Sequence, residues 1–270
     1  MYGQTFHGDT DRWLILVHGI GEHLGRAAHI ANLFAGHINV FQYDLRGHGQ
    51  SEGRRGYVDS FDVHYDDLED VVGFLVSKHP KFRYALFGHS MGALIAAAFT
   101  QRRTERVPCP ERLFLASPPI GIGGLGGAIV NRLPHRIVSG LCRIPFSLPV
   151  GATINRAYLS HDKEVPTRYK RDPLSLKRLH SKLLVGLVDA SRTVFSRPIA
   201  APCPLFAAIG SDDRIVSFDA ARRYFATHEP EADFRVFEGA YHELHNETDP
   251  YREPYFDFLK EAISGQTDEG

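Results

Sequence analysis

The sequence YALFGHSMGALIAAAF, residues 84–99, places one serine between two opposite structural signals. The apolar residues 84–87 predict a buried strand, whereas the alanine-rich residues 93–99 predict a helix. Between them, GHSMG at residues 88–92 matches the motif G-x-S-x-G, in which a sharp turn from strand to helix exposes a nucleophilic serine. The stretch therefore predicts an α/β fold with Ser90 at the carboxyl edge of its sheet.

Apolar strands and amphipathic helices alternate along most of the chain, a pattern that is typical of parallel βαβ units in one sheet. We expect a mostly parallel central sheet that is flanked by helices. The expected strands span residues 13–17, 39–43, 84–87, 112–116, 205–209 and 234–237. The expected helices span residues 26–35, 61–78, 93–99, 173–195 and 254–263.

One interval, residues 118–203, is far longer than the dozen or so residues that a parallel crossover needs. We therefore expect a core formed by residues 1–117 and 204–270, with 118–203 inserted as a cap (lid) subdomain. No acidic residue occurs between Glu111 and Asp162, and this apolar, weakly basic composition favours a lid over an apolar pocket. The alternative is a plain helical elaboration that packs on the core.

The charge balance and the cysteines narrow the class of protein. The chain has 31 basic and 32 acidic residues and a formal net charge of -1, which gives no field for binding nucleic acid. Cys109, Cys142 and Cys203 form no CxxC pair, and the polar N-terminus lacks an apolar signal core. No apolar run approaches the ~20 residues of a membrane span. We expect a cytoplasmic protein that binds no nucleic acid.

A serine nucleophile needs a general base, and the base needs an orienting acid. When G-x-S-x-G follows a strand, these partners come later in the chain, first Asp or Glu and then His. The loop after the fifth expected strand offers Asp212 and Asp213, and the loop after the sixth offers His242, with His245 as its competitor. Both loops lie where parallel sheets collect their ligand-contacting groups, so we expect them beside Ser90.

Acyl transfer also needs backbone amides that bind the developing oxyanion. Met91, directly after the expected nucleophile, supplies one of them. The loop HGIG at residues 18–21 follows the first expected strand, and Ile20 is its natural donor.

Two other chemistries compete for the same histidines and glycines. His242 and His245 are three residues apart, whereas the zinc motif H-E-x-x-H needs a spacing of four. Gly19, Gly21 and Gly25 imitate a dinucleotide fingerprint, but that interpretation leaves the Ser, Asp and His arrangement unexplained. We therefore expect neither a metal nor an organic cofactor.

Taken together, these segments resemble the monoglyceride lipase and lysophospholipase-like branch of the α/β-hydrolase family. The resemblance follows family order over nearly the whole chain. It rests on HGIGEHLGR (18–26), YDLRGHGQSEGRRGYVDSF (43–61), GHSMGA (88–93), ASPP (116–119), YKRDPL (169–174), GSDDRIV (210–216) and GAYHELHNE (239–247).

The resemblance implies an α/β-hydrolase fold in which Ser90, Asp213 and His242 form a catalytic triad. The family string is similar to GSxD, which selects Asp213 over its neighbour. The resemblance also implies that the oxyanion is bound by the amides of Ile20 and Met91.

Glu22 and Arg26 match family positions at the polar end of the pocket, near the glycerol moiety. The alternative is a salt-bridged loop that only holds the oxyanion segment. The chain departs from the family in two places. It has little room for the extra strand that usually precedes residue 13, and residues 121–149 of the lid do not match in detail.

We therefore expect a serine carboxylic ester hydrolase that cleaves monoacylglycerols or similar single-chain lipid esters through an acyl-enzyme. A short-chain carboxylesterase or a lysophospholipase is the alternative among enzymes. A catalytically silent binding protein is the alternative from another class, against which the intact Ser, Asp and His argue. The acid-free lid also predicts transient contact of residues 121–149 with a membrane or micelle.

Overall fold

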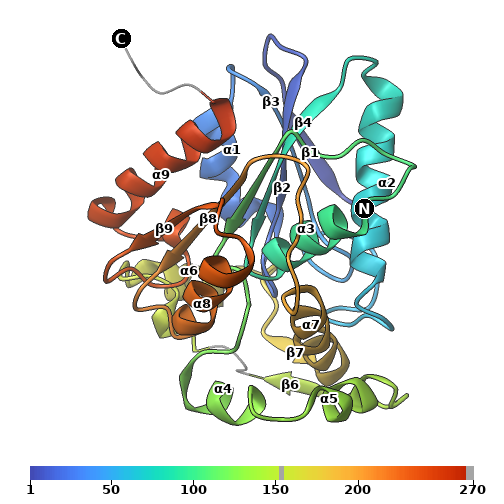
Figure 1. The fold of residues 1–270 in the computed structure, drawn as a ribbon, viewed down its shortest axis with the longest axis vertical. Helices are drawn as coiled ribbons and strands as arrows, with labels where there is room; N and C mark the ends of the chain where they lie inside the picture. The colour runs from blue at the N-terminus through green and yellow to red at the C-terminus, as the bar shows by residue number, and fades with distance from the viewer. Residues whose placement is uncertain (152–154, 266–270) are drawn as a thin grey trace.

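A seven-stranded sheet forms the centre of the computed structural model, which describes residues 1–151 and 155–265. The strand order is β1-β3-β2-β4-β5-β8-β9, and every neighbouring pair is parallel except β1 with β3 (Figure 1). The strands are β1 (Gly3–Phe6), β2 (Arg12–Val17), β3 (Asn39–Tyr43), β4 (Arg83–His89), β5 (Arg112–Ala116), β8 (Leu205–Gly210) and β9 (Asp233–Phe237). The prediction of a mostly parallel central sheet is confirmed.

The edge strand β1 contradicts the expectation that the chain has little room for a strand before residue 13. Four residues are enough, because β1 pairs antiparallel with β3 from Gly3 opposite Tyr43 to Phe6 opposite Val40. Three of the four residues are exposed, so the segment carries no apolar run from which a buried strand could be predicted.

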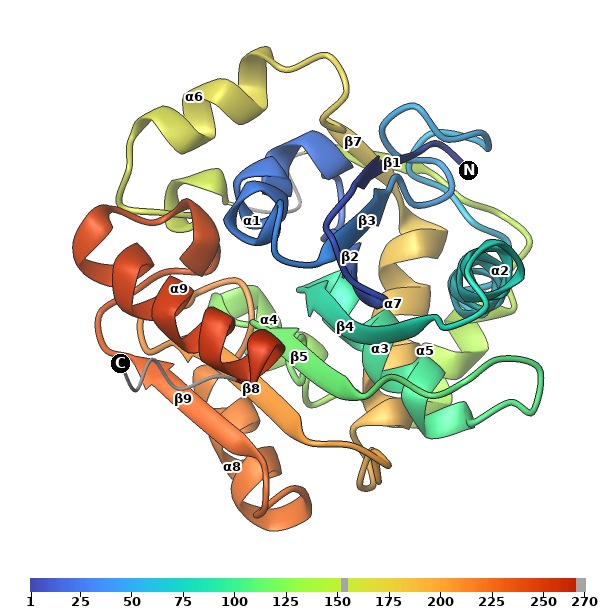
Figure 2. The same cartoon turned by 90° about the horizontal axis from the view of Figure 1, so that it is seen from above.

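Helices cover both faces of the sheet, as predicted. Alternate residues of β2 point to opposite faces, so Trp13 and Ile15 pack in one apolar cluster and Leu14 and Leu16 in another. Figure 2 shows α1 and α9 on one face and α2, α3 and α7 on the other. The helices outside the expected lid are α1 (Ala28–Phe34), α2 (Val63–Lys78), α3 (Met91–Arg102), α8 (Phe218–His228) and α9 (Asp249–Ser264). In the part of the chain that the structure describes, none of the helices has the length and apolarity that crossing a bilayer requires.

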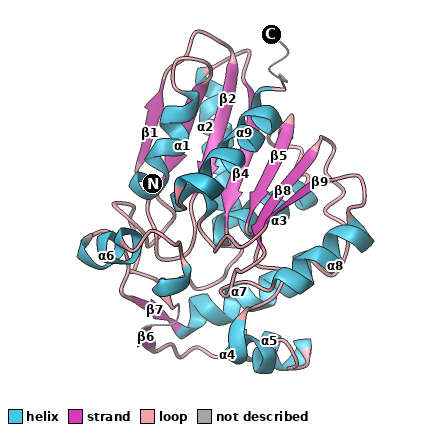
Figure 3. Cartoon of the chain, turned by 90° about the vertical axis from the view of Figure 1, so that its left-hand side faces the viewer, coloured by secondary structure: helices cyan, strands magenta, loops and turns pink. Residues whose placement is uncertain are grey.

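The segment between β5 and β8 lies beyond the carboxyl ends of the parallel strands (Figure 3). Its elements are α4 (Gly124–Val130), α5 (His135–Cys142), β6 (Pro149–Gly151), α6 (Glu164–Arg171), β7 (Arg178–His180) and α7 (Ser181–Val194). The helix expected over 173–195 is shorter than predicted, because residues 178–180 pair antiparallel with β6 instead. That this segment forms a separate lid subdomain stays a prediction.

Candidate active site

Ser90 occupies a strained turn between β4 and α3. Its φ of 52° and ψ of -118° lie in a region that residues other than glycine rarely adopt. A Cβ atom at Gly88 would overlap the backbone of Gly92, and one at Gly92 would overlap the carbonyl oxygen of Val17. The Ser90 N–H donates to the Ala116 carbonyl at 2.9 Å, which ties the turn to β5. Steric exclusion by backbone atoms therefore explains why glycines flank the serine.

His242 and Asp213 form a buried pair in the loops that follow β9 and β8. His242 Nδ1 lies 2.7 Å from Asp213 Oδ2, and the side chains are 4% and 0% exposed. The other oxygen, Asp213 Oδ1, accepts hydrogen bonds from the backbone N–H groups of Ile215 at 2.8 Å and Val216 at 3.0 Å. Asp212, in contrast, is exposed. Since a carboxylate can only accept, this pair fixes the proton of the neutral ring on Nδ1 and leaves Nε2 as the acceptor.

The environment of His242 raises the pKa of its ring. Burial works in the other direction, because desolvation disfavours the charged imidazolium. The charge of Asp213, its hydrogen bond and the nearby carboxylates of Glu243 and Glu22 outweigh that effect. The ring is therefore a stronger proton acceptor than an isolated histidine, as a general base requires.

The competing histidine has a different environment. His245 is 1% exposed, and neither of its ring nitrogens has a hydrogen-bond partner. Its ring packs edge-on against His89 at 4.7 Å between centroids. Burial, followed by the neighbouring His89 and His29, lowers its pKa well below the ordinary value. His245 lacks the carboxylate that would make it a base.

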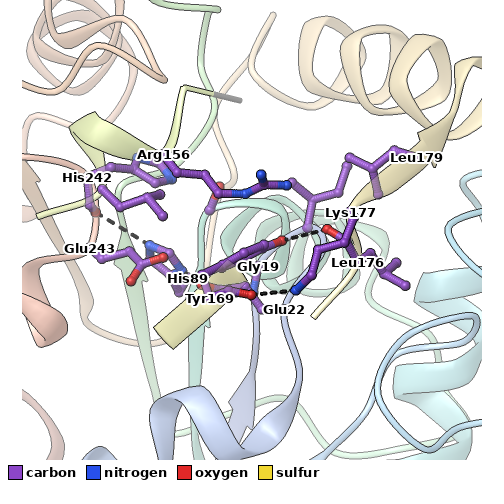
Figure 4. Close-up of a pocket in the computed structure, with 13 residues that line it drawn as sticks. Gly19, Glu22, His89, Arg156, Tyr169, Leu176, Lys177, Leu179, His242 and Glu243 are labelled. Carbon is purple, nitrogen blue, oxygen red and sulfur yellow. Dashed lines mark hydrogen bonds and ion pairs between the residues drawn. The ribbon is translucent and has the colours of Figure 1, made fainter. Parts of the chain in front are cut away.

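Ser90 and His242 line one pocket, which also receives side chains from the segment between β5 and β8 (Figure 4). The pocket encloses about 30 Å³. Its walls are lined by Gly19, Ile20, Glu22 and His89 from the first part of the chain, by Arg156, Leu159, Tyr169, Leu176, Lys177 and Leu179 from the inserted segment, and by Glu243. Side chains of the inserted segment therefore form much of the wall around Ser90.

The two predicted oxyanion donors lie at this pocket or beside it. Ile20 is part of the pocket wall. Met91 begins α3, where a backbone N–H has no acceptor within the helix. The loop around Ile20 is held on both sides, because the Gly19 N–H donates to Glu22 at 2.9 Å and the Gly21 carbonyl accepts from the Tyr169 hydroxyl at 2.8 Å.

Glu22 and Arg26 belong to a buried ion cluster with Glu243. The Arg26 guanidinium contacts both oxygens of Glu243, at 2.8 and 2.6 Å, and its Nε lies 3.4 Å from Glu22. Glu22 lines the pocket, whereas Arg26 does not. These contacts of Arg26 connect the Ile20 loop to the loop that carries His242, and the substrate-binding role of Glu22 and Arg26 stays a prediction. Glu22 both holds the loop and faces the pocket.

Several pocket residues were not predicted as site residues. Tyr169 belongs to the quoted segment YKRDPL, but its sequence context did not mark it as a wall of the pocket. Glu243 lies in the quoted segment GAYHELHNE, but its sequence context does not mark it as a pocket residue. Arg156 lies in the acid-free segment between Glu111 and Asp162, and neither it nor Lys177 belongs to a sequence motif that indicates a binding role. Within residues 1–151 and 155–265, no group of three or more His, Cys, Asp or Glu side chains is arranged to hold a metal.

Comparison with known proteins places the chain in a family. The sequence profile of the family described as "Serine aminopeptidase, S33" matches residues 8–249. The chain is 28% identical over 241 residues to a monoacylglycerol lipase of Mycolicibacterium smegmatis, covering 87% of this chain and 82% of that protein. It is 31% identical over 247 residues to the monoglyceride lipase of Rattus norvegicus, covering 88% and 78%. The crystal structure of a Paleococcus ferrophilus monoacylglycerol lipase superposes with a TM-score of 0.84 at 24% identity, covering 98% of this chain and 99% of that one. The chain therefore belongs to the serine aminopeptidase S33 family, and it is a serine hydrolase of the monoglyceride lipase-like branch of the α/β-hydrolases.

Proposed function

We propose that this protein is a carboxylic ester hydrolase that cleaves monoacylglycerols or similar single-chain lipid esters through an acyl-enzyme. The observation that carries the proposal is the 2.7 Å contact between Asp213 and His242 at a pocket that Ser90 also lines. The monoglyceride lipases among its relatives support a lipid ester as the substrate.

The proposed reaction has two steps that use the same groups. Ser90 Oγ attacks the ester carbonyl while His242 accepts the hydroxyl proton, and Asp213 holds the ring and stabilises its positive charge. The amides of Ile20 and Met91 bind the oxyanion that forms on the carbonyl oxygen. The tetrahedral intermediate then expels the alcohol, which takes the proton from His242. Water attacks the acyl-enzyme in the same way and releases the fatty acid.

Chain-length preference tests the substrate class. Leu159, Leu176 and Leu179 line the pocket, so kcat/KM for p-nitrophenyl esters is expected to rise with acyl length. Because the pocket has space of only about 30 Å³, side chains of the inserted segment move aside as the acyl chain enters, and each methylene that is then buried contributes about 0.8 kcal/mol, or roughly fourfold. Monoacylglycerol and lysophosphatidylcholine with one common acyl chain are assayed in parallel. A maximum at acetate would identify a short-chain carboxylesterase, and turnover of lysophosphatidylcholine alone would identify a lysophospholipase.

We also propose that residues 121–149 dock transiently on a membrane or micelle. Large apolar side chains gather there on the surface, and Ile129 and Phe146 are 70% and 67% exposed. Exposed apolar patches of this kind mark interaction sites. Arg136 and Arg143 lie in the same acid-free segment and would contact anionic headgroups. The patch belongs to α4, α5 and the following loop, at the end of the molecule away from β1 (Figure 1).

Vesicle binding tests this docking. The double substitution Ile129→Ser/Phe146→Ser is expected to reduce co-sedimentation with anionic vesicles by roughly tenfold or more, because each buried side chain contributes about 1.5–3 kcal/mol. Phe74→Ser is the matched control, since Phe74 is 54% exposed on α2, outside the patch. Absence of sedimentation by the unmodified protein, or an equal loss in the control, would contradict the proposal.

A further inference from the structure

Three cations surround the ring of Tyr169, which lies on α6 beside the pocket. The guanidinium carbons of Arg26 and Arg156 are each 4.7 Å from the ring centroid, and the Lys177 ammonium is 5.2 Å from it. The Tyr169 hydroxyl donates to the carbonyl of Gly21, in the loop of the expected oxyanion donor. A concentration of positive charge therefore lies next to the reacting groups.

The three cations differ in how their charge is balanced. Arg26 has two carboxylate partners, Glu22 and Glu243. Among the ion pairs of the described residues, Arg156 and Lys177 have no such partner. Lys177 instead donates to two backbone carbonyls of the α6 end, at 2.5 and 2.8 Å, which leaves one of its three N–H donors free.

Arg156 and Lys177 both line the pocket that contains Ser90, as Figure 4 shows. Glu22 and Glu243 line it too, but the carboxylates of both contact Arg26, and neither forms an ion pair with Arg156 or Lys177 among the described residues. Arg156 and Lys177 are therefore cations of the pocket wall that have no carboxylate partner among the described residues.

The remaining acid near Lys177 is Asp172, which forms no ion pair with it among the described residues. The carboxylate of Asp172 is occupied by His23 at 2.5 Å, by the Leu174 N–H and by the Ser175 hydroxyl. Burial lowers the pKa of Lys177, Asp172 opposes this change, and Arg156 and Arg26 add to it. The positive charges of Arg26, Arg156 and Lys177 repel one another when no ligand is bound, and a bound anion would reduce this repulsion.

We propose that Arg156 and Lys177 bind an anionic group, a phosphate or a carboxylate, on the alcohol part of the ester substrate. The inference rests on the proposed ester hydrolysis and narrows its substrate class. In a single-chain lipid ester the acyl chain is apolar, so only the alcohol part can carry such a group. Charge-assisted hydrogen bonds from guanidinium and ammonium are the strong contacts that recognise phosphate and carboxylate.

The test compares octanoyl esters of glycerol, glycerol 3-phosphate and lactate, each below its critical micelle concentration. The acyl chain is the same, so differences in kcat/KM report the alcohol part. At least one anionic ester is expected to be hydrolysed with roughly tenfold or greater kcat/KM than the glycerol ester. The better of the two identifies phosphate or carboxylate as the group bound. A glycerol ester that is hydrolysed as well as both anionic esters would overturn the proposal.

Substitutions assign the effect to the two cations. Arg156→Gln and Lys177→Gln are each expected to lower kcat/KM for the preferred anionic ester roughly tenfold more than kcat/KM for the glycerol ester. Lys177→Gln removes two hydrogen bonds to the end of α6 and could disturb that helix. Arg156→Gln removes no hydrogen bond to a carboxylate, so it still tests the proposal in that case. Arg178→Gln is the matched control, because Arg178 is the next residue, is exposed and does not line the pocket. Equal losses for all three esters would refute the proposal.

Binding without turnover separates this inference from the proposed function. Calorimetric titration of Ser90→Ala with the three esters is expected to give roughly tenfold tighter binding of the preferred anionic ester, an advantage that Arg156→Gln removes. If the unmodified protein binds that ester but hydrolyses none, the proposed function fails and the anion site stands. If it hydrolyses the glycerol ester and binds the anionic esters no more tightly, the anion site fails and the hydrolase stands.

Discussion

Replacing Ser90 by alanine is expected to lower kcat for ester hydrolysis by roughly 10⁴-fold or more. Alanine keeps the Cβ and adopts the same turn, so the backbone at φ 52° and the hydrogen bond to Ala116 should persist while the nucleophilic oxygen is lost. The measurement is kcat on one p-nitrophenyl ester, with thermal unfolding of both proteins as the folding control. His242→Ala should cause a similar loss, and the double variant should add little, because the groups act as one unit.

Labelling with a fluorophosphonate distinguishes the proposed hydrolase from a catalytically silent binding protein. An activated Ser90 should form a covalent adduct in the folded protein, and Ser90→Ala should form none. Folded protein without an adduct would favour the binding-only interpretation. Turnover near that of the unmodified protein in purified Ser90→Ala would refute the proposed mechanism.

Asp213→Asn is expected to lower kcat by roughly 10⁴-fold, since the amide can donate to Nδ1 and favours the wrong ring tautomer. Asp212→Asn is the matched control, because Asp212 is the adjacent residue with the same chemistry and an exposed side chain. It should retain nearly all activity, and both variants are assayed on the same ester. The reverse outcome would identify Asp212, and not Asp213, as the orienting acid.

The pH dependence of the same variant gives a second measurement. Only the neutral ring of His242 can accept the serine proton, so kcat/KM falls as pH drops through its pKa. Because that pKa is raised, the acid limb of the unmodified protein should lie above the ordinary histidine value of about 6.5. Asp213→Asn removes the charge that opposes desolvation, so the acid limb of its residual activity should move to lower pH. An unmoved limb would show that another group titrates there.

Local pattern predicted the central sheet because each of its inner strands is an apolar run buried on both faces. β2 and β5 are examples, and their expected bounds differ from the observed ones by one residue at most. The glycines around Ser90 were predictable for a related reason. A side chain at either position would overlap backbone atoms of the same turn or of the neighbouring strand. Elements without such a signal were missed. The edge strand β1 is mostly exposed, and α8 was not expected.

The sequence by itself determined the family, the parallel sheet and the order of Ser90, Asp213 and His242, because these depend on short motifs placed after apolar strands. The sequence could not determine which charged side chains pair with one another. Arg26 and Glu243 are 217 positions apart, and they pair because the loops after β2 and β9 converge at one sheet edge. Arg156 and Lys177 reach Tyr169 only through the path of the inserted segment. Periodicity reports burial against a neighbouring layer, whereas the partner of a buried charge depends on which loops the tertiary fold brings together.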